Sequence, residues 1–169
     1  RNLAQVDFPG DVAMVGKRAF QHCTSLREIT FADTLGCIDD ATFQGATSLS
    51  RVVAPGVTKI NRYAFQRCTS LVDVQFGALE TIGRRAFASC TELERIELPS
   101  TLKVIGEEAF SGCQALREVV IPESVEEIEP RAFRGCTSLD AASIPESIVQ
   151  RFPESFTQEV AARAGVVLK

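Results

Sequence analysis

The sequence predicts an α/β solenoid, a right-handed coil of stacked repeats. We expect a parallel sheet on its concave side, short helices on the other side and a helix over its C-terminal end. One observation is that seven phenylalanines recur every 22 or 23 residues along the 169-residue chain, at Phe20, Phe43, Phe65, Phe87, Phe110, Phe133 and Phe156. The other is that each stands in the same apolar pattern. A unit this short cannot enclose a core alone, but stacked units cover each other's apolar edges.

The apolar pattern is clearest when the repeats are aligned on the phenylalanine. Five residues before it come Val15, Ile38, Ile60, Ile82, Ile105 and Ile128. Three residues after it come Cys23, Ala46, Cys68, Cys90, Cys113 and Cys136. The positions eight before and six, nine and eleven after are also almost always apolar. This constant phase predicts that equivalent residues of successive repeats lie over one another.

A short strand is predicted in each unit after the phenylalanine. From Leu26 to Phe31 the side chains are expected to point alternately inward and outward, with Ile29 and Phe31 inward. A proline follows in most units, at Pro55, Pro99, Pro122 and Pro145, and ends the strand. Like strands are expected to pair in parallel about 4.8 Å apart, through right-handed crossovers.

One or two helical turns are predicted around each phenylalanine, in stretches such as "GKRAFQHC" and "GEEAFSGC". Gly45, Gly112 and Gly135 stand two residues after it, where a glycine suits the C-terminal cap of a helix. These turns are the short helices of the predicted α/β fold.

The chain is predicted to form a single domain over residues 1–169. Residues 1–11 match the strand positions of an earlier unit, residues 12–148 form six repeats, and residues 149–169 form a degenerate cap. In this cap "PESFTQEVAARAG" predicts a longer helix, with Pro153 near its start and Gly165 past its end, and "VVLK" a last strand. A start in mid-repeat leads us to expect a fragment or subunit of a larger protein or assembly.

The phrase "IGRRAFASCTELERIELP", from Ile82 to Pro99, resembles the BspA-like leucine-rich repeats of the Treponema pallidum type. The resemblance covers about residues 3–148, and the second unit departs from it with Thr42 and Ala46. It implies a leucine-rich-repeat solenoid. It also implies protein binding and adhesion rather than catalysis, as in bacterial surface proteins and protist proteins.

Composition narrows the possible partners. The net charge of −4 gives no bulk attraction to nucleic acid. No apolar run approaches the roughly 20 residues of a membrane helix, so no membrane insertion is expected. The predicted partners are therefore other proteins, and the sequence leaves the oligomeric state open.

The sequence offers no recognisable catalytic or cofactor site. His22 is the only histidine, no C-x-x-C pair exists, and no glycine-rich phosphate loop is present, so we expect no enzyme, metal or cofactor. Asp39 and Asp40 break the repeat pattern, but adjacent acids usually form solvated surface.

The six cysteines are predicted to be reduced. Five share one inward column, where side chains point alongside each other and a small apolar residue such as Ala46 also fits. Cys37 lies off this column, and its role is left open. The unpaired thiols favour an intracellular or organellar compartment over the cell surface without deciding between them.

The first candidate binding surface is the outward side of the predicted strands, here the concave strip. Eight residues after each phenylalanine, charges alternate in sign, which predicts a ladder of neighbouring ion pairs. The strip comprises Glu28, Thr30, Arg51, Val53, Asp73, Gln75, Arg95, Glu97, Glu118 and Val120. A self-neutralising structural ladder and a partner-docking surface are both compatible with this pattern.

A second candidate is a basic rim on the helix side, formed by Arg62, Tyr63, Arg84, Arg85 and Arg131. It suggests an anion-binding stripe, or simply a solvated face. The sequence as a whole predicts a non-enzymatic protein-interaction or scaffold module. A cell-surface adhesin that binds host or matrix proteins is the alternative, and an accessory domain of an enzyme is a more remote one.

Overall fold

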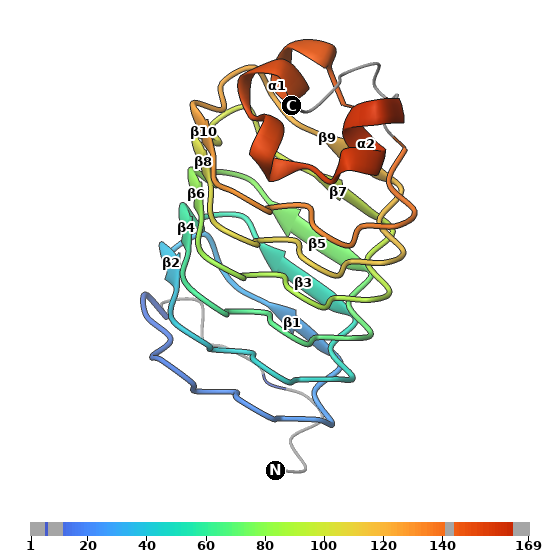
Figure 1. Cartoon of the computed structure of the whole chain (residues 1–169). Coiled ribbons are helices and arrows are strands. Elements are labelled where there is room, and N and C mark those ends of the chain that lie inside the picture. Colours follow the sequence, from blue (N-terminus) through green and yellow to red (C-terminus); the bar gives the residue numbers. More distant parts are fainter. Residues whose placement is uncertain (1–5, 7–11, 141–143, 164–169) are drawn as a thin grey trace.

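The computed structural model describes residues 6, 12–140 and 144–163, and these form a stack of similar rungs (Figure 1). Each middle rung contributes one longer and one very short strand. The longer strands are β1 (Glu28–Thr30), β3 (Arg51–Ala54), β5 (Asp73–Phe76), β7 (Arg95–Glu97) and β9 (Glu118–Val120). The short strands are β2 (Cys37–Ile38), β4 (Lys59–Ile60), β6 (Thr81–Ile82), β8 (Val104–Ile105) and β10 (Glu127–Ile128).

All strand pairs are parallel, as the sequence predicts. The longer strands form a sheet in the order β1-β3-β5 and a separate pair β7-β9. Ile29 lies opposite Val52, and Ile96 opposite Val119, so the same position of each repeat pairs with itself. This register confirms that equivalent residues stack over one another.

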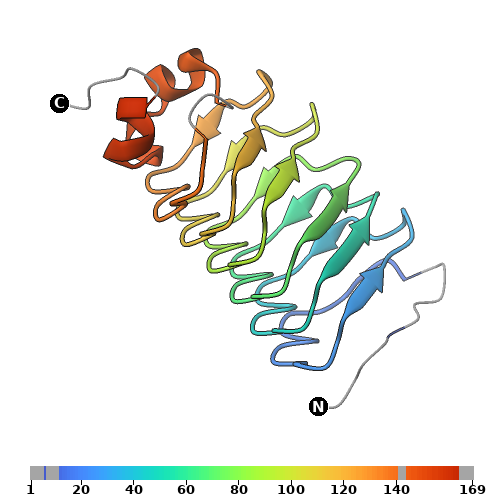
Figure 2. The same ribbon diagram turned by 90° about the vertical axis from the view of Figure 1, so that its right-hand side faces the viewer.

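A second parallel sheet was not predicted. It joins all the short strands in the order β10-β8-β6-β4-β2, and Ile38, Ile60, Ile82, Ile105 and Ile128 are its inward residues. Figure 2 shows the two rows of strands running along the stack. Strands of two residues give no alternation to detect in a sequence, so the isoleucine column revealed an inward position but not its conformation.

The short helices predicted around the phenylalanines are wrong, because these segments form turns, not helices. The N–H of Phe20 donates to the carbonyl of Thr42 at 2.8 Å, and that of Phe65 to Ala86 at 2.7 Å, both in the next rung. The intervening N–H groups close turns within the rung, as from Gln66 to Tyr63 at 3.1 Å. A helix would use all of these donors internally, whereas here every second donor links two rungs.

These turns require left-handed backbone at two positions of each unit. The glycines predicted as helix caps, Gly45, Gly112 and Gly135, have φ of 71°, 75° and 74°, so their conformation suits glycine although no helix precedes them. Other rungs place residues with side chains there, including Arg67 at φ 60° and Ser89 at φ 63°. Left-handed backbone is unfavourable for such residues.

Replacing Arg67 by glycine should therefore stabilise the protein. Relief of the left-handed backbone outweighs the greater flexibility of glycine in the unfolded chain, which leaves a gain of roughly 0.5–1 kcal/mol. Arg67 is exposed and forms no ion pair within the described structure, so little contact is lost. Urea unfolding of Arg67→Gly beside Gly112→Ala, expected to destabilise, measures the effect. A destabilised Arg67→Gly would show that the backbone carries no such strain.

The core is built around one column of aromatic rings. Phe43, Phe65, Phe87, Phe110 and Phe133 are fully buried, and their ring centroids lie 5.2–5.3 Å apart with nearly parallel planes. Phe20 and Phe156 extend the stack at its two ends. Each inner ring is thus covered by the rungs on both sides.

The C-terminal end contains helices, but not the one long helix predicted. Residues Glu146–Arg151 form α1, Pro153–Ser155 a 3-10 helix and Gln158–Arg163 α2 (Figure 1). The predicted helix starts at Pro153 only as the 3-10 helix, and the extended backbone of Phe156 (φ −108°, ψ 158°) separates it from α2. The N–H of Phe133 still donates to the carbonyl of Ser155 at 3.0 Å, so this segment occupies the place of a further rung. The predicted strand at residues 166–169 and the partial repeat at 1–11, Val6 apart, lie outside the described residues.

Candidate functional site

The residues of the predicted concave strip come together on one surface of the longer strands, which we call the long-strand face. Parallel pairing places Glu28 beside Arg51 and Arg51 beside Asp73. In β7 and β9 it places Arg95 beside Glu118 and Glu97 beside Val120. The face is also apolar in places, because Val72 and Val120 are 48% and 47% exposed.

The predicted ladder of alternating charges is present on this face but interrupted. The Nε of Arg51 lies 3.0 Å from a carboxylate oxygen of Asp73. Arg95 lies 2.7 Å from Glu97 and 3.7 Å from Glu118. Within the described residues, neither Glu28 and Arg51 nor Asp73 and Arg95 form an ion pair, although the repeat predicts both as neighbours. Exposed pairs of this kind contribute at most about 1 kcal/mol each.

The interruption between Asp73 and Arg95 coincides with a break in the sheet between β5 and β7, which we call the seam. The N–H of Val72 donates to Ser50 at 3.0 Å, and that of Arg117 donates to Glu94 at 2.8 Å. In the described structure, no such bond joins Glu94 to Val72, and no strand pairing joins β5 to β7. Val74, predicted to be buried, is therefore only half-buried.

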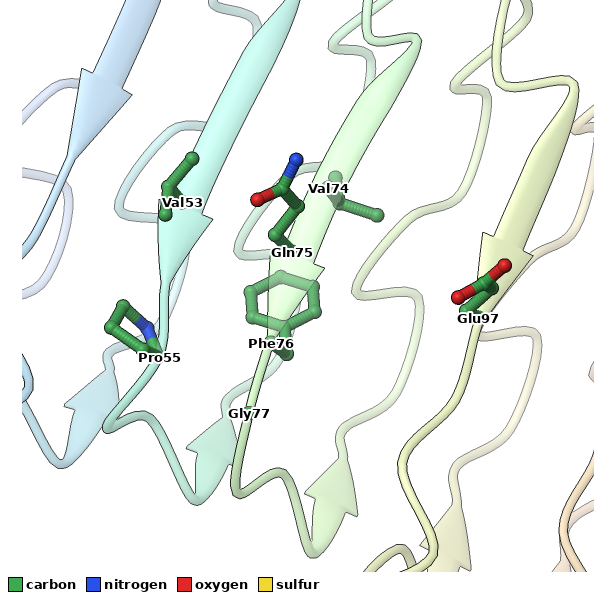
Figure 3. Close-up of a pocket in the computed structure, with 7 residues that line it drawn as sticks. All are labelled: Val53, Pro55, Val74, Gln75, Phe76, Gly77 and Glu97. Carbon is green, nitrogen blue, oxygen red and sulfur yellow. The ribbon is translucent and has the colours of Figure 1, made fainter.

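The seam is hollowed on the long-strand face. One hollow of about 310 Å³ is lined by Val53, Pro55, Val74, Gln75, Phe76, Gly77 and Glu97. A second, of about 400 Å³, also touches Val74, Gln75 and Glu97 and reaches Asp73 and Arg95. Figure 3 shows Gln75 on β5 with its side chain turned towards Val53 of β3, and Glu97 on the neighbouring β7. The sequence analysis included Gln75 and Glu97 among candidate residues but missed the hollow itself.

The residues of the predicted basic rim lie in the turn segments, and each arginine among them contacts an acid. Arg62 lies 3.1 Å from Asp40, and Arg84 lies 3.1 Å from Glu107. Arg85 bonds Glu108 at 2.5 Å, and Arg131 lies 3.2 Å from Glu107. Tyr63, also on this rim, is half-buried and has left-handed backbone.

These contacts lower the pKa values of two acids of the rim. The hydrogen bond from Arg62 lowers the pKa of Asp40, with a smaller contribution from Lys17. The hydrogen bond from Arg85 likewise lowers the pKa of Glu108. Both carboxylates are therefore held ionised against the arginines. The four arginines share three carboxylates, those of Asp40, Glu107 and Glu108, so the rim is partly neutralised and is a poorer anion site than the sequence suggests.

The cysteine column lies in the core. The thiols of Cys68, Cys90, Cys113 and Cys136 donate to the carbonyls of Phe43, Phe65, Phe87 and Phe110 at 3.1–3.2 Å. Burial raises the pKa of each of these thiols, to about 12 for Cys136. Burial and the nearby charge of Asp39 also raise the pKa of half-buried Cys37. None of these five cysteines has the lowered pKa of a reactive thiol.

The remaining polar candidates have structural contacts. Asp39 accepts hydrogen bonds from Asn61 at 3.1 Å and from the N–H of Asp40 at 2.7 Å. The imidazole of His22 is exposed and lies directly over Gly45. Within the described residues, no three His, Cys, Asp or Glu side chains gather as a metal site would require. The described helices are also too short or too polar to span a bilayer.

Comparison with known proteins places this architecture in a family. The profile of the BspA type leucine rich repeat region matches six copies over residues 1–90 and 80–161. A leucine-rich repeat protein of T. pallidum is 26% identical with a TM-score of 0.64, covering 92% of this chain and 81% of its own. One from Bacteroides ovatus is 28% identical with a TM-score of 0.59, covering 79% of this chain and 41% of its own.

A search of the curated proteins found no match. The family profile matches most of the chain, and the stacked register and phenylalanine column agree with it. The chain therefore belongs to the BspA-type leucine-rich-repeat family, whose repeats generally bind other proteins and are not enzymes.

Proposed function

We propose that the chain is a non-enzymatic interaction module that binds a partner protein on its long-strand face. The observation that carries the proposal is the coincidence, on this one face, of the hollowed seam with exposed Val72 and Val120. Exposed apolar side chains rimmed by charged residues are typical of protein-binding surfaces. The stacked core holds the face rigid, so little ordering cost accompanies binding.

The module would act as a subunit or fragment of a larger assembly. Adhesion at a cell surface would use the same face with a different partner. The basic rim is the weaker candidate because its arginines are already paired with acids. Partner proteins should therefore be insensitive to changes on the rim and sensitive to changes on the long-strand face.

The test compares three matched variants, each of which replaces an exposed apolar residue by arginine. Val72→Arg and Val120→Arg alter the long-strand face, whereas Met14→Arg alters a residue that is 81% exposed beside the short-strand sheet. Proteins captured from the native source and identified by mass spectrometry should be retained by Met14→Arg and lost by the other two. Equal capture by all three variants would rule out this face.

A further inference from the structure

The seam opens only one side of the interface between two rungs. The short strands β4 and β6 pair across the same interface, and the phenylalanine rings of the two rungs stack at 5.2 Å. On one side of the seam the N–H of Glu92 donates to the carbonyl of Thr69 at 3.2 Å, and on the other the hydroxyl of Thr101 donates to Leu79 at 2.8 Å. Between these two bonds, the described residues of β5 and β7 are not joined.

The two strand edges that face each other across the seam are complementary. In the rungs on either side, the N–H of Val72 donates to Ser50 at 3.0 Å and that of Arg117 donates to Glu94 at 2.8 Å. Among the described residues, the seam leaves the N–H of Glu94 and the carbonyl of Val72 unbonded, which are the donor and the acceptor of the same position of the repeat. Backbone groups in a protein interior strongly favour such partners. The group best suited to either edge is therefore the other edge.

The open seam leaves Val74 only half-buried. The other described residues nine after a phenylalanine are at most 2% exposed, and these are Ile29, Val52, Ile96 and Val119. Val74 lines both hollows. Movement of β7 against β5 would cover Val74 and remove the hollows, and the burial of apolar surface favours this movement.

The charged residues of the seam have alternative partners. If the register of β3 and β5 continued into β7, Asp73 would lie opposite Arg95. In the structure, Asp73 instead contacts Arg51 at 3.0 Å, and Arg95 contacts Glu97 at 2.7 Å. Exposed ion pairs of this kind are weak, so the exchange of one partner for another costs little free energy.

We propose that the seam is a joint with two arrangements. In the open arrangement, which the structure shows, β5 and β7 are unpaired and both hollows are present (Figure 3). In the closed arrangement Glu94 donates to Val72, Asp73 pairs with Arg95, and the hollows are filled by the approach of the strands. The joint thereby decides whether the hollowed surface is available to a partner, and this consequence alone rests on the proposed function.

Hydrogen exchange of the backbone amides, followed by NMR on the ¹⁵N-labelled chain without a partner, tests the joint. The amide of Glu94 should exchange about tenfold or more faster than those of Val72 and Arg117, which are bonded in both arrangements. It should also exchange about tenfold or more slowly than in an unfolded chain, because the closed arrangement protects it. Exchange at the unfolded rate would show a seam that is always open, and exchange as slow as that of Val72 one that is always closed. Either result would overturn the proposal.

Two substitutions should shift the joint in opposite directions. Asp73→Asn removes the carboxylate that Arg95 meets in the closed arrangement, so the amide of Glu94 should exchange roughly two- to fivefold faster. Glu97→Gln releases Arg95 from its partner in the open arrangement, so exchange should slow by a similar factor. Glu123→Gln removes an exposed carboxylate outside both hollows and should leave the rate unchanged. A rate that responds to neither seam variant, or in the same direction to both, would overturn the joint whatever the outcome of partner capture.

Discussion

Phe87→Ala is expected to lower the free energy of unfolding by about 3–5 kcal/mol. Phe87 is fully buried, and its ring stacks on Phe65 at 5.2 Å and on Phe110 at 5.3 Å. Phe76 packs against its edge at 6.2 Å. Truncation removes contacts in three rungs and leaves a cavity that the stacked neighbours cannot easily fill. Urea unfolding followed by circular dichroism measures the loss.

Phe156→Ala provides the matched comparison. Among the described rings, Phe156 stacks only on Phe133, at 5.2 Å, and it remains 5% exposed. Because one side of its ring has no aromatic neighbour in the described structure, its truncation should cost clearly less than that of Phe87. Phe87→Leu should cost less than Phe87→Ala, since it restores part of the lost volume. Equal losses for the two alanine variants would contradict the stacking described for the column.

Alkaline pH is expected to destabilise the protein strongly through its buried thiols. Folding raises the pKa of Cys68, Cys90, Cys113 and Cys136 above 9.0, the usual value of an exposed thiol, because burial disfavours the thiolate. The unfolded chain therefore releases protons that the native state retains. The stabilising effect is complete below pH 9 and is lost as the pH rises towards about 12, where Cys136 titrates in the folded state.

The size of this loss follows from proton linkage. At one pH unit above the pKa of the thiol in the unfolded chain, each buried thiol has lowered the free energy of unfolding by about 1.4 kcal/mol. The four together should lower the free energy of unfolding by roughly 5–6 kcal/mol between pH 7 and pH 10. Urea unfolding at a series of pH values in the presence of a reductant measures this dependence.

The Cys90→Ala/Cys113→Ala double variant is the control. It removes two of the four thiols, so its loss between pH 7 and pH 10 should be about half that of the parent. Its lower stability at pH 7 does not enter the comparison, because only the change with pH is used. Other groups that titrate in this range are common to both proteins and cancel. The same pH dependence in both would show that the core thiols do not carry the effect.

Much of the fold was predictable because every unit carries the same apolar pattern. The constant phase of the phenylalanine, isoleucine and cysteine positions was enough to predict parallel strands and a stacked core. The turns were not predictable as such, because "GKRAFQHC" and similar stretches also suit a helix. Their left-handed residues, among them Arg67 and Ser89, are stabilised by bonds to the next rung that no single unit reveals.

The candidate site was likewise predictable from the sequence only in part. The alternating charges of Arg51, Asp73, Arg95 and Glu118 were readable from the repeat, and two of the expected neighbouring pairs form. The missing pairs, Glu28 with Arg51 and Asp73 with Arg95, were not readable. The second of them coincides with the break between β5 and β7, which only the three-dimensional structure shows.

The sequence by itself determined that identical units stack in register and which side of each unit is buried, since burial of an apolar column depends only on period and residue type. Only the tertiary structure decided which backbone groups find partners in the next rung. That outcome depends on distances between rungs, and these are set by the volumes of side chains far apart in the sequence. The second sheet, the turns in place of helices and the open seam all arise from this level of the structure.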